Sequence, residues 1–286
     1  MPIQSILDND LYKFTMMNAV LQSFPGTDAE YRFQDRRPLG QFNRAFLAGL
    51  TEQLDKMADL RMRDQEMAYI RGKLPLLSDS DFLSHLHDYR FDPDEVWYEV
   101  DAEGHFHLQV RGSWSRTILW EVPLLSAITE QYFLHCDTVW NMDHQESLAA
   151  RKSSLLRDAG CTYSDFGTRR RRNNRTQEIF IKQAMGKPGF LGTSNVHFAQ
   201  VFDLTAVGTM GHEWIMGVSG LQGLRRANRD ALWRWADTYG KNPGIALTDT
   251  FGVDAFFEDF GPELARLYDG VRHDSGDPYE FGERVI

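Results

Sequence analysis

The sequence predicts an α/β protein: an irregular TIM-like α/β barrel that is incomplete in this chain, preceded by a smaller N-terminal α+β domain. Two observations lead to this prediction. From residue 162 onward, short runs of apolar or small residues lead into helical stretches, a pattern typical of parallel strands. The distinctive polar motifs stand directly after those runs, and in such a barrel the loops that follow the strands meet on one face. We therefore divide the chain into residues 1–150 and 151–286.

The N-terminal domain is predicted to combine helices with antiparallel strands. Leu11 and Phe14 share one side of a helix predicted over residues 8–23, which Pro25 and the following glycine stop. Tyr31 and Phe33 alternate with polar or charged neighbours, as in a half-buried strand. The other predicted elements are a helix over 42–69, a hairpin of strands 96–100 and 105–111, and a helix over 118–140 that begins near Pro123.

The barrel domain is predicted to contain the first five βα units of the barrel. The strand candidates are residues 163–167, 190–195, 205–209, 244–249 and 271–275. Helices are predicted over residues 176–185, 196–202, 226–239 and 254–267. Because such a barrel needs about eight strands to close, we expect either a truncated chain or a partner that supplies the rest.

Composition and charge exclude several classes of function. The chain has 31 basic and 41 acidic residues, a net charge of −10, which disfavours nucleic acid and anionic membranes as partners. Asp8 and Asp10 stand where a signal peptide would be basic and then apolar, and no apolar run approaches the ~18 residues of a membrane span. The two cysteines, Cys136 and Cys161, suggest no disulfide framework. We expect a soluble, cytoplasmic protein.

The first motif, FGTRRRRNNR, follows the strand candidate 163–167. Guanidinium groups bind phosphate bidentately, so Arg169 and Arg170 are predicted to bind a substrate phosphate, with the later arginines on a helix surface. Phe166, beside Gly167, is either a core residue or a ring face for an aromatic substrate.

Two further motifs place Gly-Thr at the end of a strand candidate. GTSN supplies Gly192, Thr193 and Ser194, whose backbone N–H groups and hydroxyls can bind an anion. GTMGHEW supplies His212, which precedes an acidic residue. A histidine at such a position is a candidate nucleophile or general base.

The last two motifs, TDTF and RHDSGDP, supply carboxylates. Asp249 and Asp274, with Arg272 nearby, suggest a hydrated Mg²⁺ bound together with substrate phosphates. In contrast, the histidine pairs HLH and HFH are not expected to bind zinc, because no acidic or cysteine partner has matching spacing.

Taken together, these motifs resemble those of bacterial nicotinate phosphoribosyltransferases, of the type II phosphoribosyltransferase family. The resemblance runs through LDNDLYKFTM, ILWEVPLL, DFGTRRR, GTSN, GTMGHEW, IALTD and RHDSGDP. It implies an irregular barrel, a homodimer with the active site at the subunit interface, and Mg²⁺. The implied reaction joins nicotinate to phosphoribosyl pyrophosphate, giving nicotinate mononucleotide and pyrophosphate, with ATP hydrolysis coupled through a phosphohistidine.

The resemblance also implies roles for single residues, carried over motif by motif. His212 matches the phosphorylated histidine. Phe166 matches a ring on one face of the base, and Arg169 an arginine near the substrate phosphate and base. Tyr12 of DLYK matches a tyrosine that reaches the partner subunit's site and stacks on the base.

The acidic motifs are matched in the same way. Arg272 and Asp274 match a pair on the base and ribose side, and Asp249 an acid near the metal and pyrophosphate. A later glycine-rich phosphate loop of the family is not found in this sequence.

Three alternatives stay open. A nicotinamide enzyme carries an acid where this chain has Ser194, and that carboxylate would repel nicotinate. A quinolinate enzyme would need more basic residues. A truncated chain that binds a metabolite without catalysis is the alternative from a different class.

Overall fold

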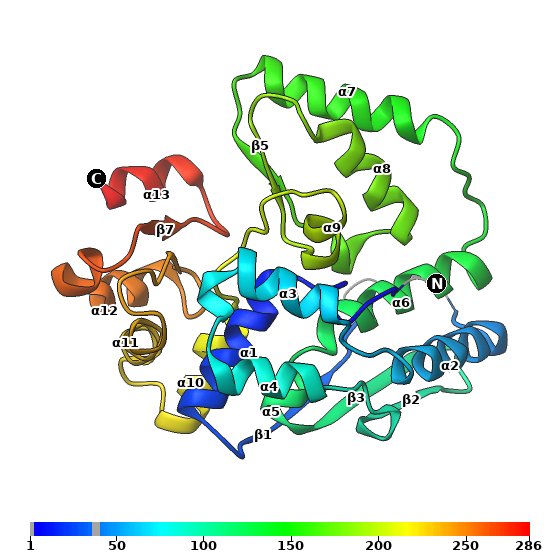
Figure 1. The fold of residues 1–286 in the computed structure, drawn as a ribbon, viewed down its shortest axis with the longest axis horizontal. Helices are drawn as coiled ribbons and strands as arrows, with labels where there is room; N and C mark the ends of the chain where they lie inside the picture. The colour runs from blue at the N-terminus through cyan, green and yellow to red at the C-terminus, as the bar shows by residue number, and fades with distance from the viewer. Residues whose placement is uncertain (1–2, 36–40) are drawn as a thin grey trace. The chain divides into compact units, whose positions relative to one another are not determined.

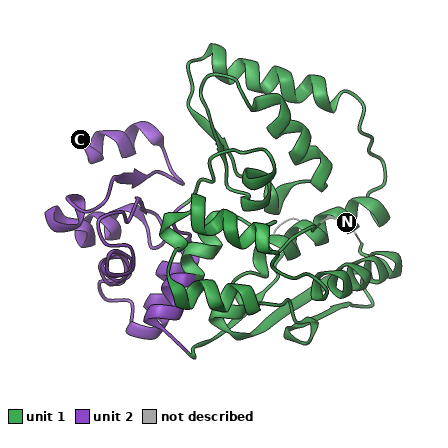
Figure 2. Ribbon diagram, viewed as in Figure 1, with its two compact units in different colours: residues 1–17, 26–208 green, residues 18–25, 209–286 purple. Residues whose placement is uncertain are grey.

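The computed structural model describes residues 3–35 and 41–286, and Figure 1 shows them as a mixture of helices and strands. The chain forms two compact units, coloured separately in Figure 2. Unit 1 comprises residues 1–17 and 26–208, and unit 2 comprises residues 18–25 and 209–286.

Unit 1 contains a three-stranded antiparallel sheet in the order β1-β3-β2. The strands are β1 (Asp28–Arg32), β2 (Val96–Val100) and β3 (Phe106–Ser113). Phe106, Leu108 and Val110 alternate with more exposed residues along β3, as expected of a sheet with one buried face. The predicted hairpin is confirmed, and Asp101 shapes its turn by accepting hydrogen bonds from the backbone N–H groups of residues 103 and 105.

The helices of unit 1 surround that sheet and a second, smaller one. They are α2 (Arg44–Ala58), α3 (Asp64–Lys73), α4 (Ser80–Asp88), α5 (Trp114–Thr117), α6 (Glu121–His135), α7 (Gln145–Asp158), α8 (Asn174–Ala184) and α9 (Val196–Val201). Short 3₁₀ helices are η1 (Pro75–Leu77), η2 (Pro93–Glu95) and η3 (Thr168–Arg170). Phe42, Phe46, Phe106 and Tyr132 form an aromatic core with ring centroids 4.8–5.3 Å apart.

Several predicted helices of this region differ from the structure. The single helix predicted over 42–69 is wrong, because α2 ends at Ala58 and α3 begins at Asp64. Asn43 caps α2 by accepting a hydrogen bond from the N–H of Phe46, and Glu66 accepts one from the N–H of Arg63 at the start of α3. The helices α4 and α7 were not predicted. The helix α1 (Leu11–Ser23) ends where the sequence predicted.

The second sheet of unit 1 is a parallel pair, β4 (Tyr163–Asp165) and β5 (Phe190–Thr193). The strand predicted over 205–209 is reduced to one parallel bridge between Thr193 and Ala206. Both strands of the pair end beside motif residues, as the sequence predicted.

Unit 2 contains another parallel pair, β6 (Ile245–Leu247) and β7 (Gly270–Arg272). Its helices are α10 (His212–Gln222), α11 (Ala227–Tyr239), α12 (Val253–Ala265) and α13 (Pro278–Val285). Trp214 packs against Trp235, which packs against Tyr239, with centroids 5.6 and 4.7 Å apart. Helix α10 was not predicted.

The α/β class is confirmed, but no closed barrel is seen in the described part of the chain. Its parallel strands form two separate pairs of short strands rather than one continuous ring.

Candidate functional site

The loop after β4 carries the motif Phe166–Arg170 and is held by Asp165. The buried carboxylate of Asp165 accepts hydrogen bonds from the N–H of Gly167 (3.2 Å), from Gln177 Nε2 (2.7 Å) and from Thr193 Oγ1 (2.7 Å). A Cβ on Gly167 would lie 2.9 Å from Asp165 Oδ1, so glycine permits this tight turn. Phe166 is 46% exposed on this loop, so it is not a core residue.

The end of β5 carries Gly192, Thr193 and Ser194. A Cβ on Gly192 would lie 2.0 Å from the carbonyl oxygen of Thr205. Thr193 and Ser194 are fully buried, and the hydroxyl of Ser194 donates to Asp10 Oδ1 at 2.7 Å. Ser194 was expected to donate to a substrate carboxylate, and in this arrangement it would first have to release Asp10.

The arginines of the FGTRRRR motif have different environments. The side chain of Arg169 is 36% exposed, and Arg170 is exposed. The prediction that the later arginines lie on a helix surface is wrong for Arg171, whose side chain is 1% exposed. Its guanidinium donates to both oxygens of Asp8, each at 2.9 Å, because the fully buried Asp8 needs a positive partner. Arg172 stacks over the ring of Phe133, 3.6 Å from its centroid.

Arg169 belongs to a group that we call the Arg169 cluster, formed by Asp10, Tyr12, Lys13, Glu121 and Arg169. Arg169 Nη1 donates to Glu121 Oε1 at 2.8 Å, and Lys13 Nζ donates to Glu121 Oε2. Burial raises the pKa of the Tyr12 phenol strongly, and the nearby charge of Asp10 raises it further. Burial also raises the pKa of Asp10, against the opposing effect of the hydrogen bond from Ser194. The tyrosine and arginine that the sequence singled out therefore lie together within one chain.

A second group, the His212 cluster, lies in unit 2. His212, the first residue of α10, has its Nε2 3.0 Å from Asp249 Oδ1 and 3.7 Å from Asp274 Oδ2. The hydroxyl of Ser275 donates to the other oxygen of Asp249 at 2.5 Å. Burial opposes the charge on Asp249, but the hydrogen bonds from Ser275 and His212 outweigh it and lower the pKa of this carboxyl group. Arg272 Nε lies 3.4 Å from Asp274 Oδ1. The structure thus brings together four residues that the sequence predicted from three separate motifs.

Ligand atoms of His212, Asp249 and Asp274 lie within 4.8 Å of one another, close enough to share a metal ion. Two carboxylates with a neighbouring phosphate are the oxygen ligands that Mg²⁺ prefers. These residues therefore fit the predicted metal.

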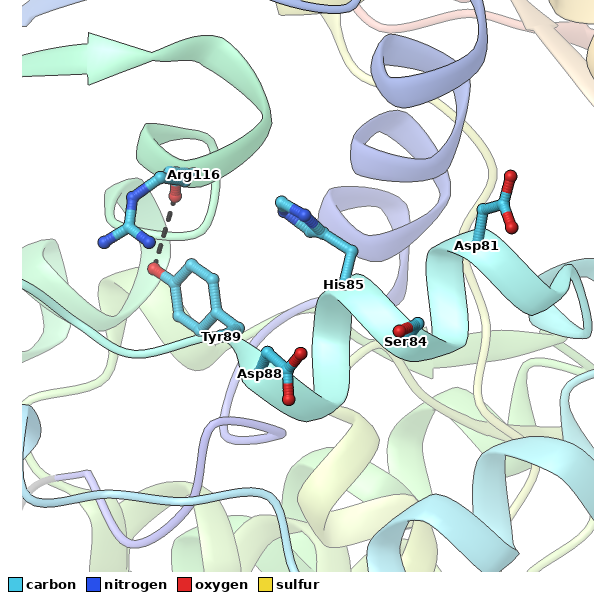
Figure 3. Close-up of a pocket in the computed structure, with 6 residues that line it drawn as sticks. All are labelled: Asp81, Ser84, His85, Asp88, Tyr89 and Arg116. Carbon is cyan, nitrogen blue, oxygen red and sulfur yellow. Dashed lines mark hydrogen bonds between the residues drawn. The ribbon is translucent and has the colours of Figure 1, made fainter.

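The HFH histidines do have an acidic partner, contrary to the prediction. His105 Nδ1 and His107 Nε2 lie 3.2 and 2.9 Å from the same oxygen of Asp101, across the hairpin turn. The HLH pair lies on the helix α4 and not on an extended strand. Figure 3 shows a surface hollow beside α4, lined by Asp81, Ser84, His85, Asp88, Tyr89 and Arg116, none of which was a predicted site residue.

Sequence reasoning missed the residues that hold the predicted ones, among them Asp8, Lys13, Glu121 and Arg171. A signal for Glu121 was present, since it is the one charged residue in the apolar run ILWEVPLL. A charge at a buried position is rarely tolerated without a partner. Asp8 and Asp10 were used only as an argument against a signal peptide.

The described residues include no helix long and apolar enough to cross a membrane.

Unit 1 thus carries an exposed aromatic ring and two arginines on one loop, and unit 2 carries a histidine beside two carboxylates. Comparison with known proteins identifies the family. Residues 7–129 match the N-terminal domain of the nicotinate phosphoribosyltransferase (NAPRTase) family, and residues 161–286 match the model of that family. The chain belongs to the nicotinate phosphoribosyltransferase family.

Individual relatives agree with this assignment. The chain is 42% identical to a nicotinate phosphoribosyltransferase of Methanosarcina mazei over 302 aligned residues, which cover 99% of this chain and 74% of that protein. It is 41% identical to the one from Methanosarcina acetivorans, with the same coverage. The crystal structure of nicotinate phosphoribosyltransferase from Porphyromonas gingivalis superposes with a TM-score of 0.91 at 35% identity, covering 99% of this chain and 73% of that chain.

Proposed function

We propose that this enzyme transfers a phosphoribosyl group from phosphoribosyl pyrophosphate to nicotinate in NAD salvage, and that ATP hydrolysis is coupled to the transfer through a phosphohistidine at His212. Membership of the family supports the transfer reaction. The observation that carries the coupling is the contact between His212 Nε2 and Asp249 Oδ1 at 3.0 Å.

This contact assigns the imidazole its tautomer. A carboxylate accepts a hydrogen bond and donates none, so Asp249 holds the Nε2–H form and leaves the lone pair on Nδ1. His212 is 41% exposed, so ATP can approach that nitrogen. Nδ1 attacks the γ-phosphorus, ADP leaves, and the negative charge of Asp249 stabilises the imidazolium as the bond forms.

We also propose that Asp249 and Asp274 hold Mg²⁺. When bound, the ion supplies positive charge that neutralises substrate phosphates. Arg272 supports this role, because its guanidinium lies beside Asp274, with Nε 3.4 Å from Oδ1, and adds positive charge next to the proposed phosphate site.

In unit 1 we propose a base and phosphate pocket formed by Tyr12, Phe166, Gly167, Arg169, Arg170, Gly192, Thr193 and Ser194. Phe166 and Tyr12 would lie against the pyridine ring and hold its nitrogen in line with the ribose carbon. Arg169 and Arg170 would bind an anionic group of the substrates. As the bond to the ribose carbon breaks, negative charge develops on the leaving pyrophosphate, and fixed positive charge stabilises that transition state.

For the assembly, we propose a homodimer with its active site at the subunit interface and, for the fold, an irregular barrel to which the two parallel strand pairs belong. Tyr12 lies among Asp10, Glu121 and Arg169 of its own chain.

Replacing His212 by Asn tests the coupling. The His212→Asn protein should hydrolyse no ATP and gain no stimulation from it, while retaining slow, ATP-independent formation of nicotinate mononucleotide. Incubating the wild-type enzyme with γ-labelled ATP should give acid-labile label, and ³¹P NMR of the denatured phosphoprotein should place it on Nδ1. Equal labelling of the Asn variant would show that another residue is phosphorylated.

A further inference from the structure

The carboxylate of Glu121 is shared between two cations of very different exposure. Its Oε2 pairs with Lys13 Nζ, whose side chain is fully buried, and its Oε1 accepts a hydrogen bond at 2.8 Å from Nη1 of Arg169, which is 36% exposed. The three residues come from three segments that are far apart in the sequence: α1, the first turn of α6 and η3. Through these two contacts, Glu121 connects the loop after β4 with the helices α1 and α6.

The contact with Glu121 leaves two nitrogens of the Arg169 guanidinium available to donate to a ligand. Its Nη2 and Nε make no hydrogen bond within the described residues, although Nη1 is occupied. A guanidinium gains affinity for an anion when its plane is held in one orientation, because less side-chain freedom is lost on binding. An arginine without such an anchor would sample many rotamers on an exposed loop.

The charges of the cluster keep Glu121 ionised beside Arg169. Burial disfavours the charge on Glu121, but Lys13 and Arg169 outweigh it and lower its pKa. Arg169 is the exposed cation of this pair of contacts, so its guanidinium is the one that an anion from solution can reach.

We propose that Glu121 is a positioning residue that fixes the guanidinium of Arg169 for an anionic group of the substrates, and that Lys13 permits this carboxylate to be buried. The proposal rests on the proposed function, since Arg169 is taken to face nicotinate or phosphoribosyl pyrophosphate.

The substitution Glu121→Gln distinguishes the contact with Lys13 from the contact with Arg169. Glutamine offers one oxygen and one NH₂ group where glutamate offers two oxygens. Because the side chain of Lys13 is fully buried and that of Arg169 is 36% exposed, water can replace the lost contact of Arg169 but not that of Lys13. The glutamine oxygen therefore turns to Lys13 and the NH₂ group faces Arg169, so the variant should release Arg169 and keep the contact with Lys13.

We expect Glu121→Gln to raise the KM of nicotinate or of phosphoribosyl pyrophosphate about tenfold or more, the usual consequence of losing one charged hydrogen bond. Adding Lys13→Met in the same chain returns the oxygen of the introduced glutamine to Arg169, so the double variant should have a lower KM than Glu121→Gln alone. Should Glu121→Gln fail to fold, Glu121→Asp keeps a charge for Lys13 but is one methylene shorter, and it should show the same rise in KM.

The matched control is Glu95→Gln. Glu95 also divides its oxygens between two donors, Arg116 Nε and Trp120 Nε1, each at 2.8 Å, and its side chain is 11% exposed. It touches no predicted site residue, so this variant should lose stability without any change in KM.

Unchanged KM values for both substrates in a folded Glu121 variant would overturn the proposal, as would a double variant that is no better than Glu121→Gln. A wild-type enzyme that makes no nicotinate mononucleotide would instead refute the proposed function. The role of Glu121 would then be judged by calorimetric binding of the two anions to wild type and variant.

Discussion

Replacing Asp8 by Asn should be among the most destabilising single substitutions in unit 1. Arg171 donates to both oxygens of Asp8 at 2.9 Å, and the two side chains are 1% and 0% exposed. The NH₂ group of Asn195 donates to Asp8 Oδ1 at 2.7 Å as well. An asparagine at position 8 would turn an NH₂ group toward at least one of these donors and remove the negative charge that Arg171 contacts with two of its nitrogens.

The magnitude follows from the burial of both partners. Breaking a buried pair by removing one charge costs about 3–5 kcal/mol. For a protein of this size, each kcal/mol lowers Tm by about 2–4 °C, so Asp8→Asn should lower Tm by roughly 6–20 °C. Thermal unfolding followed by circular dichroism measures this directly.

The double variant Asp8→Asn/Arg171→Met makes the test specific. Methionine removes the buried positive charge and fills similar volume, so the double variant should be more stable than Asp8→Asn alone. The control is Glu52→Gln, which breaks an exposed pair with Lys56 and should change Tm little. A small loss for Asp8→Asn, or a double variant less stable than both single ones, would refute the reasoning.

Four further predictions concern Asp10, Gly192 and Tyr12 of unit 1. Because burial raises the pKa of Asp10, the KM of nicotinate should rise with pH as that carboxyl group ionises beside Ser194, and Asp10→Asn should remove this dependence. Because of the same raised pKa, Asp10 stays protonated to a higher pH in the folded state than in the unfolded state. The contribution of Asp10 to the free energy of unfolding should therefore fall as pH rises above about 4, and urea denaturation of wild type and Asp10→Asn across pH measures this fall. Gly192→Ala should destabilise by more than about 1 kcal/mol, because a Cβ would lie 2.0 Å from the carbonyl oxygen of Thr205 at a φ of +150°; a thermal melt unchanged from wild type would contradict the geometry. Mixed dimers of Tyr12→Ala and Asp274→Ala chains should regain no activity if Tyr12 serves its own subunit, whereas recovery of up to about half would show that it acts in the partner.

The sequence by itself determined the α/β class, the family and the identity of the motif residues. Those motifs are local: a glycine, a hydroxyl or an arginine directly after a strand is visible within a few positions. The hairpin around Asp101 and the end of α1 at Ser23 were equally local, because turn and stop residues determine them.

Only the tertiary structure decided which charges meet. Asp8 and Arg171 are separated by 163 residues, and Glu121 and Arg169 by 48, so no local pattern could pair them. The same holds for Ser194, whose hydroxyl was expected to face a substrate and instead donates to Asp10, 184 residues away. The four consecutive arginines cannot be told apart in the sequence. In the structure, Arg171 is buried and pairs with Asp8, whereas Arg169 is 36% exposed and pairs with Glu121. The physical reason is that a buried charge must find its partner wherever the fold brings one, at whatever distance along the chain.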